Sequence, residues 1–381
     1  MNVALPAKCV IIGPAFPLRG GIAQLNESLA RQLTAMGVQT SIYSFSLQYP
    51  EFLFPGKTQK EVGTRTIEGM SVYSTINSIA PWTWRTTAKR IVDEKPDIII
   101  VRFWIPFMAP CLAYIARYAW GRLDVPVVGL LDNVVPHEHR LGDRMLTQMF
   151  LNSCKYFVVM SSSVKADLAS FNRTRPRKLL YHPVYDHFGE KLSMEEARKH
   201  LCLSMDDKVI LFFGLVRNYK GLDILLEAVA KMPQREHVKV LVAGEFYEDK
   251  AHCLSIIKTH GLENNVIIRD EFIPEDEVKY YFCASNIVAQ PYRTATQSGV
   301  TQIAYHFETP MLVTDVGGLA EIVPNKVVGY VCKPEPQVIS EQLSLFLSGN
   351  DEEKFRSHLP QEKLRFEWKN FANEMVTWDS N

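Results

Sequence analysis

Short runs of apolar, β-branched residues alternate with helix-length amphipathic segments along the chain, and this alternation limits its fold more than any other feature. Runs of this length and composition are typical of strands buried on both faces. Strands that alternate with helices predict parallel sheets covered by helices on both sides. In the first half the predicted strands are residues 10–12, 41–44, 98–101, 127–131 and 156–160.

The pattern breaks near residue 180, in a proline-containing segment, and then starts again. The predicted strands of the second half are residues 208–213, 238–243, 266–268, 287–290 and 311–314. A chain of 381 residues exceeds one ordinary core. We therefore predict an α/β fold of two Rossmann-like, doubly wound parallel-sheet domains facing a cleft. The predicted boundaries are 1–184, 185–362, and a C-terminal helix at 363–381 that packs back on the body.

Charge and cysteine usage exclude several classes of protein. The 42 basic and 42 acidic residues give no net charge, so nothing favours nucleic acid as a partner. The seven cysteines are scattered, with no CxxC pair, as in reduced proteins. The first 16 residues suggest a strand and turn rather than a signal peptide. We expect a cytoplasmic protein.

The most apolar stretch, residues 103–120, contains Pro106, Pro110 and Arg117 and is short for a membrane span. It predicts a buried helix. The alternative is a membrane-facing patch, which would suit a lipid-linked acceptor and a peripheral position at the inner face of the membrane.

A glycine-containing turn follows the first predicted strand, with Gly13, Gly20 and Gly21 before a helix that begins near Ile22. Glycine lets the backbone approach a ligand, and a helix N-terminus offers free N–H groups to phosphate. The spacing does not match GxGxxG, which disfavours dinucleotide binding. A plain tight turn is the alternative.

Two cations, Arg217 and Lys220, follow a strand that ends at Gly214 and stand at the entrance to a helix. A guanidinium fork and an ammonium group in this position can hold a diphosphate. The alternative is a pair of solvated charges on a surface turn.

A third segment, residues 296–301, joins a strand to a helix. Its backbone N–H groups and hydroxyls can face an anion, so the candidate donor-binding residues here are Gln297, Ser298, Gly299, Val300 and Thr301. Glu245, which follows another strand of this half, can meet a nucleotide base, with core packing as the alternative.

The fourth cluster follows a strand of the first half, in the sequence LLDNVVPHEHR. Asp132 and His137 can orient an acceptor hydroxyl or move its proton. The pair His137 and His139 is poor support for a metal, and no D-x-D stands at a strand end, so we expect no metal and no other cofactor. A satisfied polar turn is the alternative.

The Gly-Gly loop, the G-x-x-R-x-x-K-G motif at 214–221 and the closing TDVGGLAEIV resemble the retaining GT-B glycosyltransferases of family 4, over nearly the whole chain. The resemblance implies that Arg217 and Lys220 bind the diphosphate of a nucleotide-sugar donor. It also implies that the loop of Gly20 and Gly21 closes over donor and acceptor. The acceptor would be a saccharide or lipid-linked, in polysaccharide or glycoconjugate synthesis, and anomeric configuration would be retained.

The chain departs from this family in the E-x7-E segment, where Thr296 and Ala304 replace the two glutamates that the family uses for sugar and ribose. Gln297 or Gln302 can hydrogen-bond sugar hydroxyls instead. The sequence GVTQI is similar to the GLTQL of the glycogen-synthase branch. The alternatives are a nucleotide-sugar epimerase of similar fold, a catalytically degenerate GT-B partner subunit and, least supported, an NAD-linked oxidoreductase.

Overall fold

The computed structural model describes residues 5–50, 70–135, 140–171, 174–185, 188–295 and 298–378. The chain divides into two compact units. Unit 1 comprises Met1–Tyr181 and Trp368–Asn381, and unit 2 comprises His182–Glu367.

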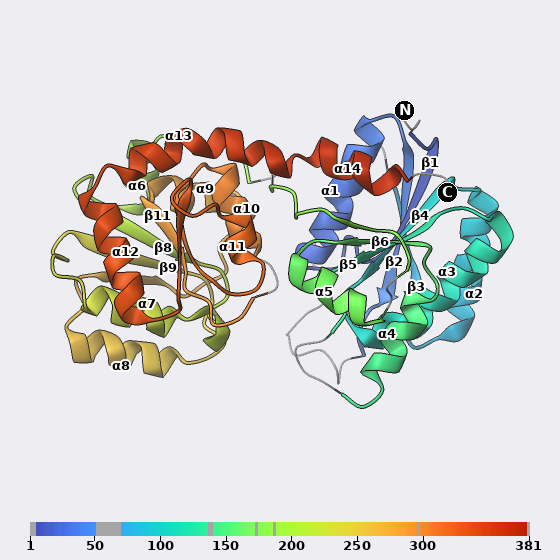
Figure 1. The fold of residues 1–381 in the computed structure, drawn as a ribbon, viewed down its shortest axis with the longest axis horizontal. Helices are drawn as coiled ribbons and strands as arrows, with labels where there is room; N and C mark the ends of the chain where they lie inside the picture. Colours follow the sequence, from blue (N-terminus) through green and yellow to red (C-terminus); the bar gives the residue numbers. More distant parts are fainter. Residues whose placement is uncertain are drawn as a thin grey trace. The chain divides into compact units, whose positions relative to one another are not determined.

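Unit 1 is built on a seven-stranded parallel sheet in the order β3-β2-β1-β4-β5-β6-β7 (Figure 1). Its strands are β1 Lys8–Ile12, β2 Gln39–Leu47, β3 Ser71–Asn77, β4 Ile98–Phe103, β5 Val127–Leu131, β6 Tyr156–Val159 and β7 Arg177–Leu179. Its helices are α1 Gly21–Ala35, α2 Pro81–Glu94, η2 Pro106–Met108, α3 Ala109–Leu123, α4 Asp143–Leu151, α5 Ser162–Phe171 and α14 Trp368–Val376.

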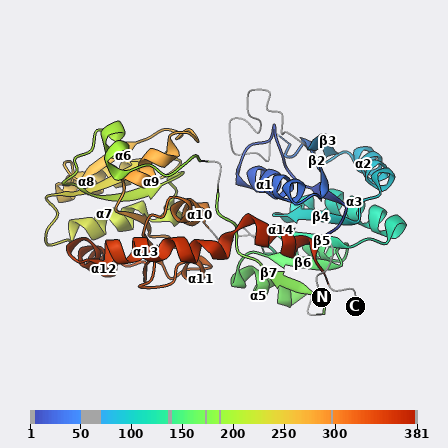
Figure 2. The same cartoon turned by 90° about the horizontal axis from the view of Figure 1, so that it is seen from above.

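Both faces of this sheet are buried, as the alternation along β1 shows. Val10 and Ile12 belong to a core with α2, α3, α4 and α5, whereas Cys9 and Ile11 belong to a second core with α1 and α14. Seen from above, α2 and α3 lie on one side of the strands and α14 on the other (Figure 2). The C-terminal helix thus completes the hydrophobic core of the unit that contains the N-terminus.

Unit 2 has a six-stranded parallel sheet in the order β10-β9-β8-β11-β12-β13. Its strands are β8 Lys208–Phe213, β9 Val238–Ala243, β10 Val266–Arg269, β11 Ile287–Gln290, β12 Met311–Thr314 and β13 Gly329–Cys332. Its helices are α6 Met194–Leu201, η3 Asn218–Lys220, α7 Leu222–Ala230, α8 Lys250–His260, α9 Val278–Ala284, α10 Gly299–His306, α11 Leu319–Ile322, α12 Pro336–Ser348, α13 Asp351–Lys363 and η4 Leu364–Phe366. The helices α7, α8 and α12 share one core with its strands.

The structure confirms the predicted fold class, since both sheets are parallel throughout and doubly wound. It adds three strands that the apolar runs did not predict, β3, β7 and β13, and each of them forms an edge of its sheet. The structure divides the chain after Tyr181 and starts the last helix at Trp368, within unit 1.

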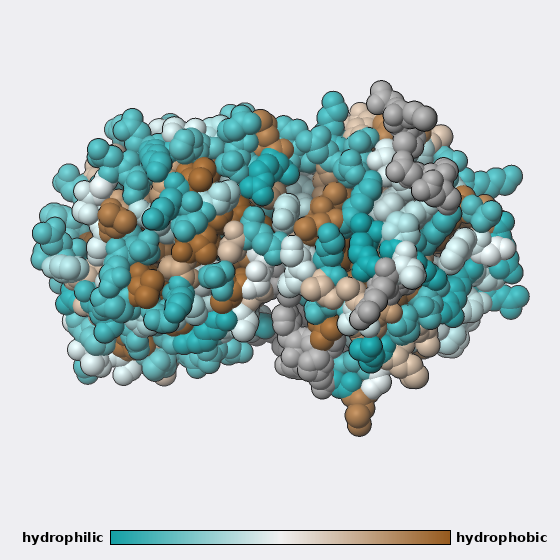
Figure 3. Space-filling model, viewed as in Figure 1, coloured by the Kyte–Doolittle hydropathy of each residue, from teal (hydrophilic) through white to brown (hydrophobic). Residues whose placement is uncertain are grey.

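The apolar stretch at 103–120 forms the end of β4, η2 and most of α3, and most of its side chains are buried in the unit 1 core. Tyr114 and Arg117 are its exposed residues. On the face shown in Figure 3, apolar side chains stand in small groups among polar ones. None of the helices in the described ranges is long and apolar enough to cross a membrane.

Candidate functional site

In each sheet, two central strands mark the point where the strand order reverses. In unit 2 these strands are β8 and β11, which pair through Ile287 and Ile210. In unit 1 they are β1 and β4. In open α/β sheets, ligands bind outside the carboxyl ends of the strands at such a switch point. The loops after these four strands therefore carry the candidate sites.

The loop after β8 places Lys220 against the strand end. Gly214 has φ +90°, and a Cβ at this position would lie 2.9 Å from Lys220 Nζ. Gly221, with φ +69°, ends the η3 turn, and a Cβ there would lie 2.1 Å from the Pro291 carbonyl oxygen. Only glycine fits both positions, so these two glycines of the G-x-x-R-x-x-K-G motif allow the ammonium group to reach the switch point.

The Lys220 side chain is a buried cation, only 9% exposed. Burial, assisted by the charge of Arg217, lowers the pKa of Lys220 to about 8. Its ammonium group lies 5.9 Å from the centre of the Tyr292 ring. Among the described residues it has neither an ion pair nor a hydrogen-bond acceptor. A buried charge without a partner is costly, so this position favours an anionic ligand.

Arg217 lies on the same loop, half-buried, with its guanidinium carbon 5.1 Å from the centre of the Tyr247 ring. In the part of the chain that the structure describes, no carboxylate pairs with it. The sequence prediction that Arg217 and Lys220 lie together at a strand end agrees with this geometry, and their role in binding a diphosphate stays a prediction.

The sequence reasoning missed Arg293, which ties the loop after β11 to the loop after β8. Its guanidinium donates to the Asn218 carbonyl oxygen at 2.7 Å and to Asp223 Oδ1 at 2.9 Å. Burial acts to raise the pKa of Asp223, but the hydrogen bonds and charge of Arg293 outweigh it and leave that pKa below its usual value. The pair thus fixes the Arg217–Lys220 turn beside β11. The only signal in the sequence was a cation three residues after a strand.

The N-terminus of α10 lies at the end of the same loop. Ser298 is its N-cap residue, and the Ser298 and Tyr292 hydroxyls lie 3.3 Å apart. Gly299 and Val300 open the helix, and Thr301 donates to Gln290 Oε1 at 3.2 Å from a buried position. Four of the five predicted donor-binding residues of this segment therefore lie at the carboxyl edge of the unit 2 sheet. Gln297 and Thr296 lie outside the described residues.

Two residues of α10 that bear on the missing family glutamates are fully buried. Ala304, at the position of the second family glutamate, is 0% exposed. Gln302 is also 0% exposed, and neither atom of its amide has a hydrogen-bond partner among the described residues. In this structure a sugar hydroxyl cannot reach Gln302, contrary to the alternative role considered for it. Glu245 is exposed at the end of β9, where its carbonyl oxygen accepts from the Val216 N–H at 2.9 Å.

In unit 1 the loop after β1 leads to α1, which begins at Gly21 with Gly20 as its N-cap at φ 111°. Both glycines are exposed. The first intrahelical bonds are donated by Ala23 and Gln24, so the N–H groups before them are free of the helix ladder. The predicted helix start is confirmed, and the first turn of α1 can donate to a ligand.

The loop after β5 places Asp132 at the same edge, but paired with Arg102. The Arg102 Nε donates to Asp132 Oδ2 at 2.6 Å, and a second bond joins Nη2 to Oδ1. Arg102 is the penultimate residue of β4 and is 2% exposed, with its Nη1 unpaired among the described residues. Burial raises the pKa of Asp132, and the Arg102 charge opposes that rise. Asp132, predicted to orient an acceptor hydroxyl or move its proton, is therefore a partner in a bidentate ion pair.

Arg102 was missed because it lies within a strand that is otherwise apolar. His137, the other predicted catalytic residue, lies outside the described ranges, as do Glu138 and His139. No group of three His, Cys, Asp or Glu suited to a metal ion occurs in the ranges that are described.

Comparisons with known proteins fit this geometry. Residues 193–362 match the family described as Glycosyl transferases group 1, and residues 19–184 match Glycosyltransferase Family 4. This chain is a GT-B glycosyltransferase of the group 1, family 4 type.

Relatives of this glycosyltransferase match it over most of their length. An uncharacterized glycosyltransferase of Methanocaldococcus jannaschii is 24% identical, over 94% of this chain and 93% of its own. D-inositol 3-phosphate glycosyltransferase of Corynebacterium urealyticum is also 24% identical, over 94% and 89%. The crystal structure of Anabaena HepE in complex with UDP superposes with a TM-score of 0.72, at 16% identity, over 97% of this chain and 98% of HepE. This last likeness concerns the fold.

Proposed function

We propose that this glycosyltransferase moves a sugar from a nucleotide-diphosphate donor to a saccharide or lipid-linked acceptor, with retention of configuration. The observation that carries the proposal is Lys220, a buried cation without an anionic partner among the described residues, beside Arg217 at the switch point of unit 2. A pyrophosphate supplies the missing negative charge. That HepE was solved with UDP supports a nucleotide donor.

The chemistry of this transfer suits two fixed cations. As the glycosidic bond breaks, negative charge grows on the leaving diphosphate, so its contacts with Arg217 and Lys220 strengthen in the transition state. The free N–H groups at the start of α10, beside Ser298, Gly299 and Val300, add a helix-terminal anion site. We propose that these groups replace a metal, and that the enzyme needs no cofactor.

We propose unit 1 as the acceptor side. Gly20 and Gly21 offer backbone donors at the start of α1, and Asp132 presents a carboxylate fixed by Arg102. Hydroxyl groups of a saccharide match such a set of donors and acceptors. His137 follows Asp132 on the same loop in sequence and is proposed as the residue that moves the acceptor proton.

A thermal-unfolding panel with UDP, GDP, ADP, their sugars and NAD tests the donor assignment. A ligand present at about 100 times its dissociation constant adds about 2.7 kcal/mol to native stability, which is easily measured. We expect a shift with one diphosphate that is lost in Arg217→Ala/Lys220→Ala and kept in Lys231→Ala, a matched change of an exposed lysine after α7. A shift that persists in the double variant contradicts the site, and a shift with NAD alone contradicts the function.

Product analysis separates the remaining alternatives. A transferase releases the nucleoside diphosphate and glycosylates an acceptor, whereas an epimerase converts the nucleotide sugar with no acceptor present. A degenerate partner subunit would bind no nucleotide or turn none over.

We further propose that the enzyme is cytoplasmic and touches the inner face of the membrane through the aromatic–basic surface of Trp84, Tyr114, Arg117, Tyr118 and Met149. These residues line a cavity of about 490 Å3 that has no acidic member among its described lining residues. Aromatic and basic side chains together suit the interface of an anionic bilayer.

Sedimentation with phosphatidylglycerol vesicles tests this contact. We expect Tyr114→Ser/Arg117→Ala to weaken binding and Phe272→Ser, a change of an exposed aromatic residue of unit 2, to leave it intact. Equal binding by both variants contradicts the proposed surface.

A further inference from the structure

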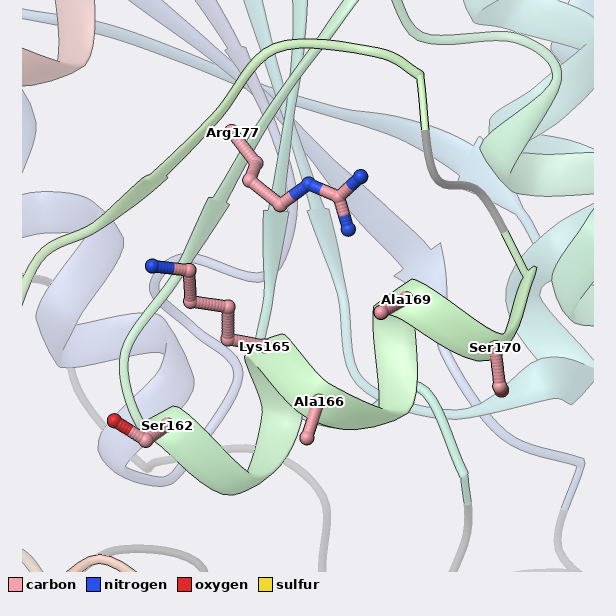
Figure 4. Close-up of a pocket in the computed structure, with 6 residues that line it drawn as sticks. All are labelled: Ser162, Lys165, Ala166, Ala169, Ser170 and Arg177. Atoms are coloured by element: carbon pink, nitrogen blue, oxygen red, sulfur yellow. The ribbon is translucent and has the colours of Figure 1, made fainter.

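A pocket of about 750 Å3 lies in unit 1 on the exposed side of α5, beside the edge strand β7 (Figure 4). Its described lining residues are Ser162, Lys165, Ala166, Ala169, Ser170 and Arg177. The five residues from α5 recur at intervals of three and four, so they share one face of the helix. The volume falls within the range of small-molecule sites and exceeds what a single inorganic ion would fill.

Two cations dominate the lining of this pocket. Figure 4 shows Lys165 and Arg177 extending from α5 and β7 toward opposite ends of the same space. Within the described chain neither side chain has an ion pair or hydrogen bond, and no acidic residue is among the lining residues. Because the whole protein has no net charge, this local excess of positive charge is not part of a generally basic surface.

Small residues provide the space between the two cations. The short side chains of Ala166 and Ala169 leave open space over the middle of this helix face. The side chains of Ser162 and Ser170 lie at its two ends (Figure 4). The Ser170 hydroxyl donates to the Asp167 carbonyl oxygen at 2.7 Å, and its oxygen can still accept from a sugar hydroxyl. The pocket combines charge for an oxyanion with hydrogen-bonding groups and room for a sugar ring.

The position of α5 connects the pocket to the acceptor side. Ser162 begins α5 three residues after β6 ends, so this end of the pocket starts at the carboxyl edge of the unit 1 sheet, the edge that also bears Asp132. Arg177 opens β7 at the amino edge, and the pocket extends away from the switch point. A ligand group bound here would be remote from the reacting hydroxyl.

We propose that the α5–β7 pocket binds an oxyanion substituent, a phosphate or carboxylate, on the saccharide acceptor. The proposal rests on the proposed transferase function and deepens it, because it makes the acceptor a sugar phosphate or uronate rather than a neutral sugar. Lys165 and Arg177 hold the oxyanion, Arg177 as a fork and Lys165 as a point charge.

Ligand-observed NMR on the full chain tests this site with glucose 6-phosphate, glucuronic acid and glucose as probes. We expect binding of at least one of the charged probes and not of glucose. In Lys165→Ala/Arg177→Ala the affinity should fall by about tenfold or more, since two charge-assisted contacts are lost. The matched control, Arg85→Ala/Lys89→Ala, removes two exposed cations of α2 and should bind like the wild type.

Two further arms separate the outcomes. Nucleotide-induced thermal shifts on the same variants should be unchanged, because the donor cations lie in unit 2. If the wild type binds a nucleotide but neither charged probe, or if the double variant binds the probes as well as the wild type does, the pocket assignment is overturned while the transferase function stands. If no nucleotide binds, the proposed function fails independently. Binding to phosphatidylglycerol vesicles alone, lost in the double variant, would assign the oxyanion to a lipid headgroup and overturn the saccharide assignment.

Discussion

The two switch points have the same topology and opposite electrostatics. In unit 1 the cation near the end of β4, Arg102, is neutralised within the protein by Asp132. In unit 2 the cation behind β8, Lys220, is nearly as deeply buried, yet no described acidic residue pairs with it. The buried charge at the unit 1 edge is therefore neutralised before any ligand binds, whereas the buried charge at the unit 2 edge is neutralised only when an anion binds. Under the proposed function, this contrast suits the unit 1 edge to a polyhydroxyl acceptor and the unit 2 edge to a diphosphate donor.

The largest effect should follow from removing one partner of the Arg102–Asp132 ion pair. Asp132→Ala leaves Arg102 buried without its partner, and breaking such a pair costs about 3–5 kcal/mol. Urea unfolding should show this loss, whereas Asp93→Ala, at an exposed position of α2, should change stability little. Arg102→Met/Asp132→Leu should recover most of the lost stability, because an apolar pair leaves no buried charge without a partner. A single variant as stable as the wild type would mean that unit 1 does not depend on this neutralisation.

The next largest effect tests the carboxyl edge of the unit 2 sheet, where Lys220 has no described acidic partner. Arg217→Ala should lower kcat/KM by about 100- to 1,000-fold, since a charge that stabilises the leaving diphosphate is lost. Its unfolding free energy should stay close to that of the wild type, because Arg217 has no described ion pair to break. Steady-state kinetics beside urea unfolding measures both. If turnover stays within a few-fold of the wild type, the anion site is elsewhere and the contrast between the edges disappears.

Much of this architecture could be predicted from the sequence, but unevenly. The strands predicted from apolar runs lie mostly in the middle of the sheets, where burial on both faces imposes a continuous apolar pattern. The missed strand β3 is largely exposed, and β7 has only three residues, all partly exposed. Edge strands have one neighbour and weaker patterning, so the sequence alone carries little signal for them.

For the candidate site, the positions of single residues could be predicted from the sequence better than their ion-pair partners could. Lys220 and Arg217 could be located because glycines and a strand end surround them. The Arg102–Asp132 and Arg293–Asp223 pairs join residues 30 and 70 positions apart, and no local pattern records such contacts. Asp132 was therefore expected to be open to a ligand, without the partner that fixes it.

A smaller effect concerns the Arg293–Asp223 ion pair, which positions the turn of Arg217 and Lys220. Asp223→Ala removes the carboxylate bound by Arg293 and should cost about 2 kcal/mol, less than a fully buried pair because both side chains are partly exposed. The pKa of Asp223 is below its usual value, so this stability is present above the unfolded-state pKa and is lost as pH falls through the folded-state pKa. Urea unfolding at neutral and acidic pH measures it, with Asp276→Ala as an exposed control. Equal losses at both pH values would contradict the ion pair.

The smallest effect, a pH dependence, separates ligand binding from folding. The pKa of Lys220 is lowered to about 8, so raising the pH from about 7 to about 9 should weaken binding of the nucleoside diphosphate identified in the thermal-unfolding panel about tenfold, as the ammonium group loses its proton. Stability of the empty protein should change in the opposite sense. A lysine with a lowered folded-state pKa binds fewer protons than the unfolded chain, so burying it costs less above that pKa and stability rises with pH. Calorimetric titration of the wild type beside Lys220→Arg, whose charge persists, makes the test specific. A flat profile for the arginine variant and a falling one for the wild type would assign the dependence to this one group, whereas parallel profiles would show that the dependence comes from another group and not from Lys220.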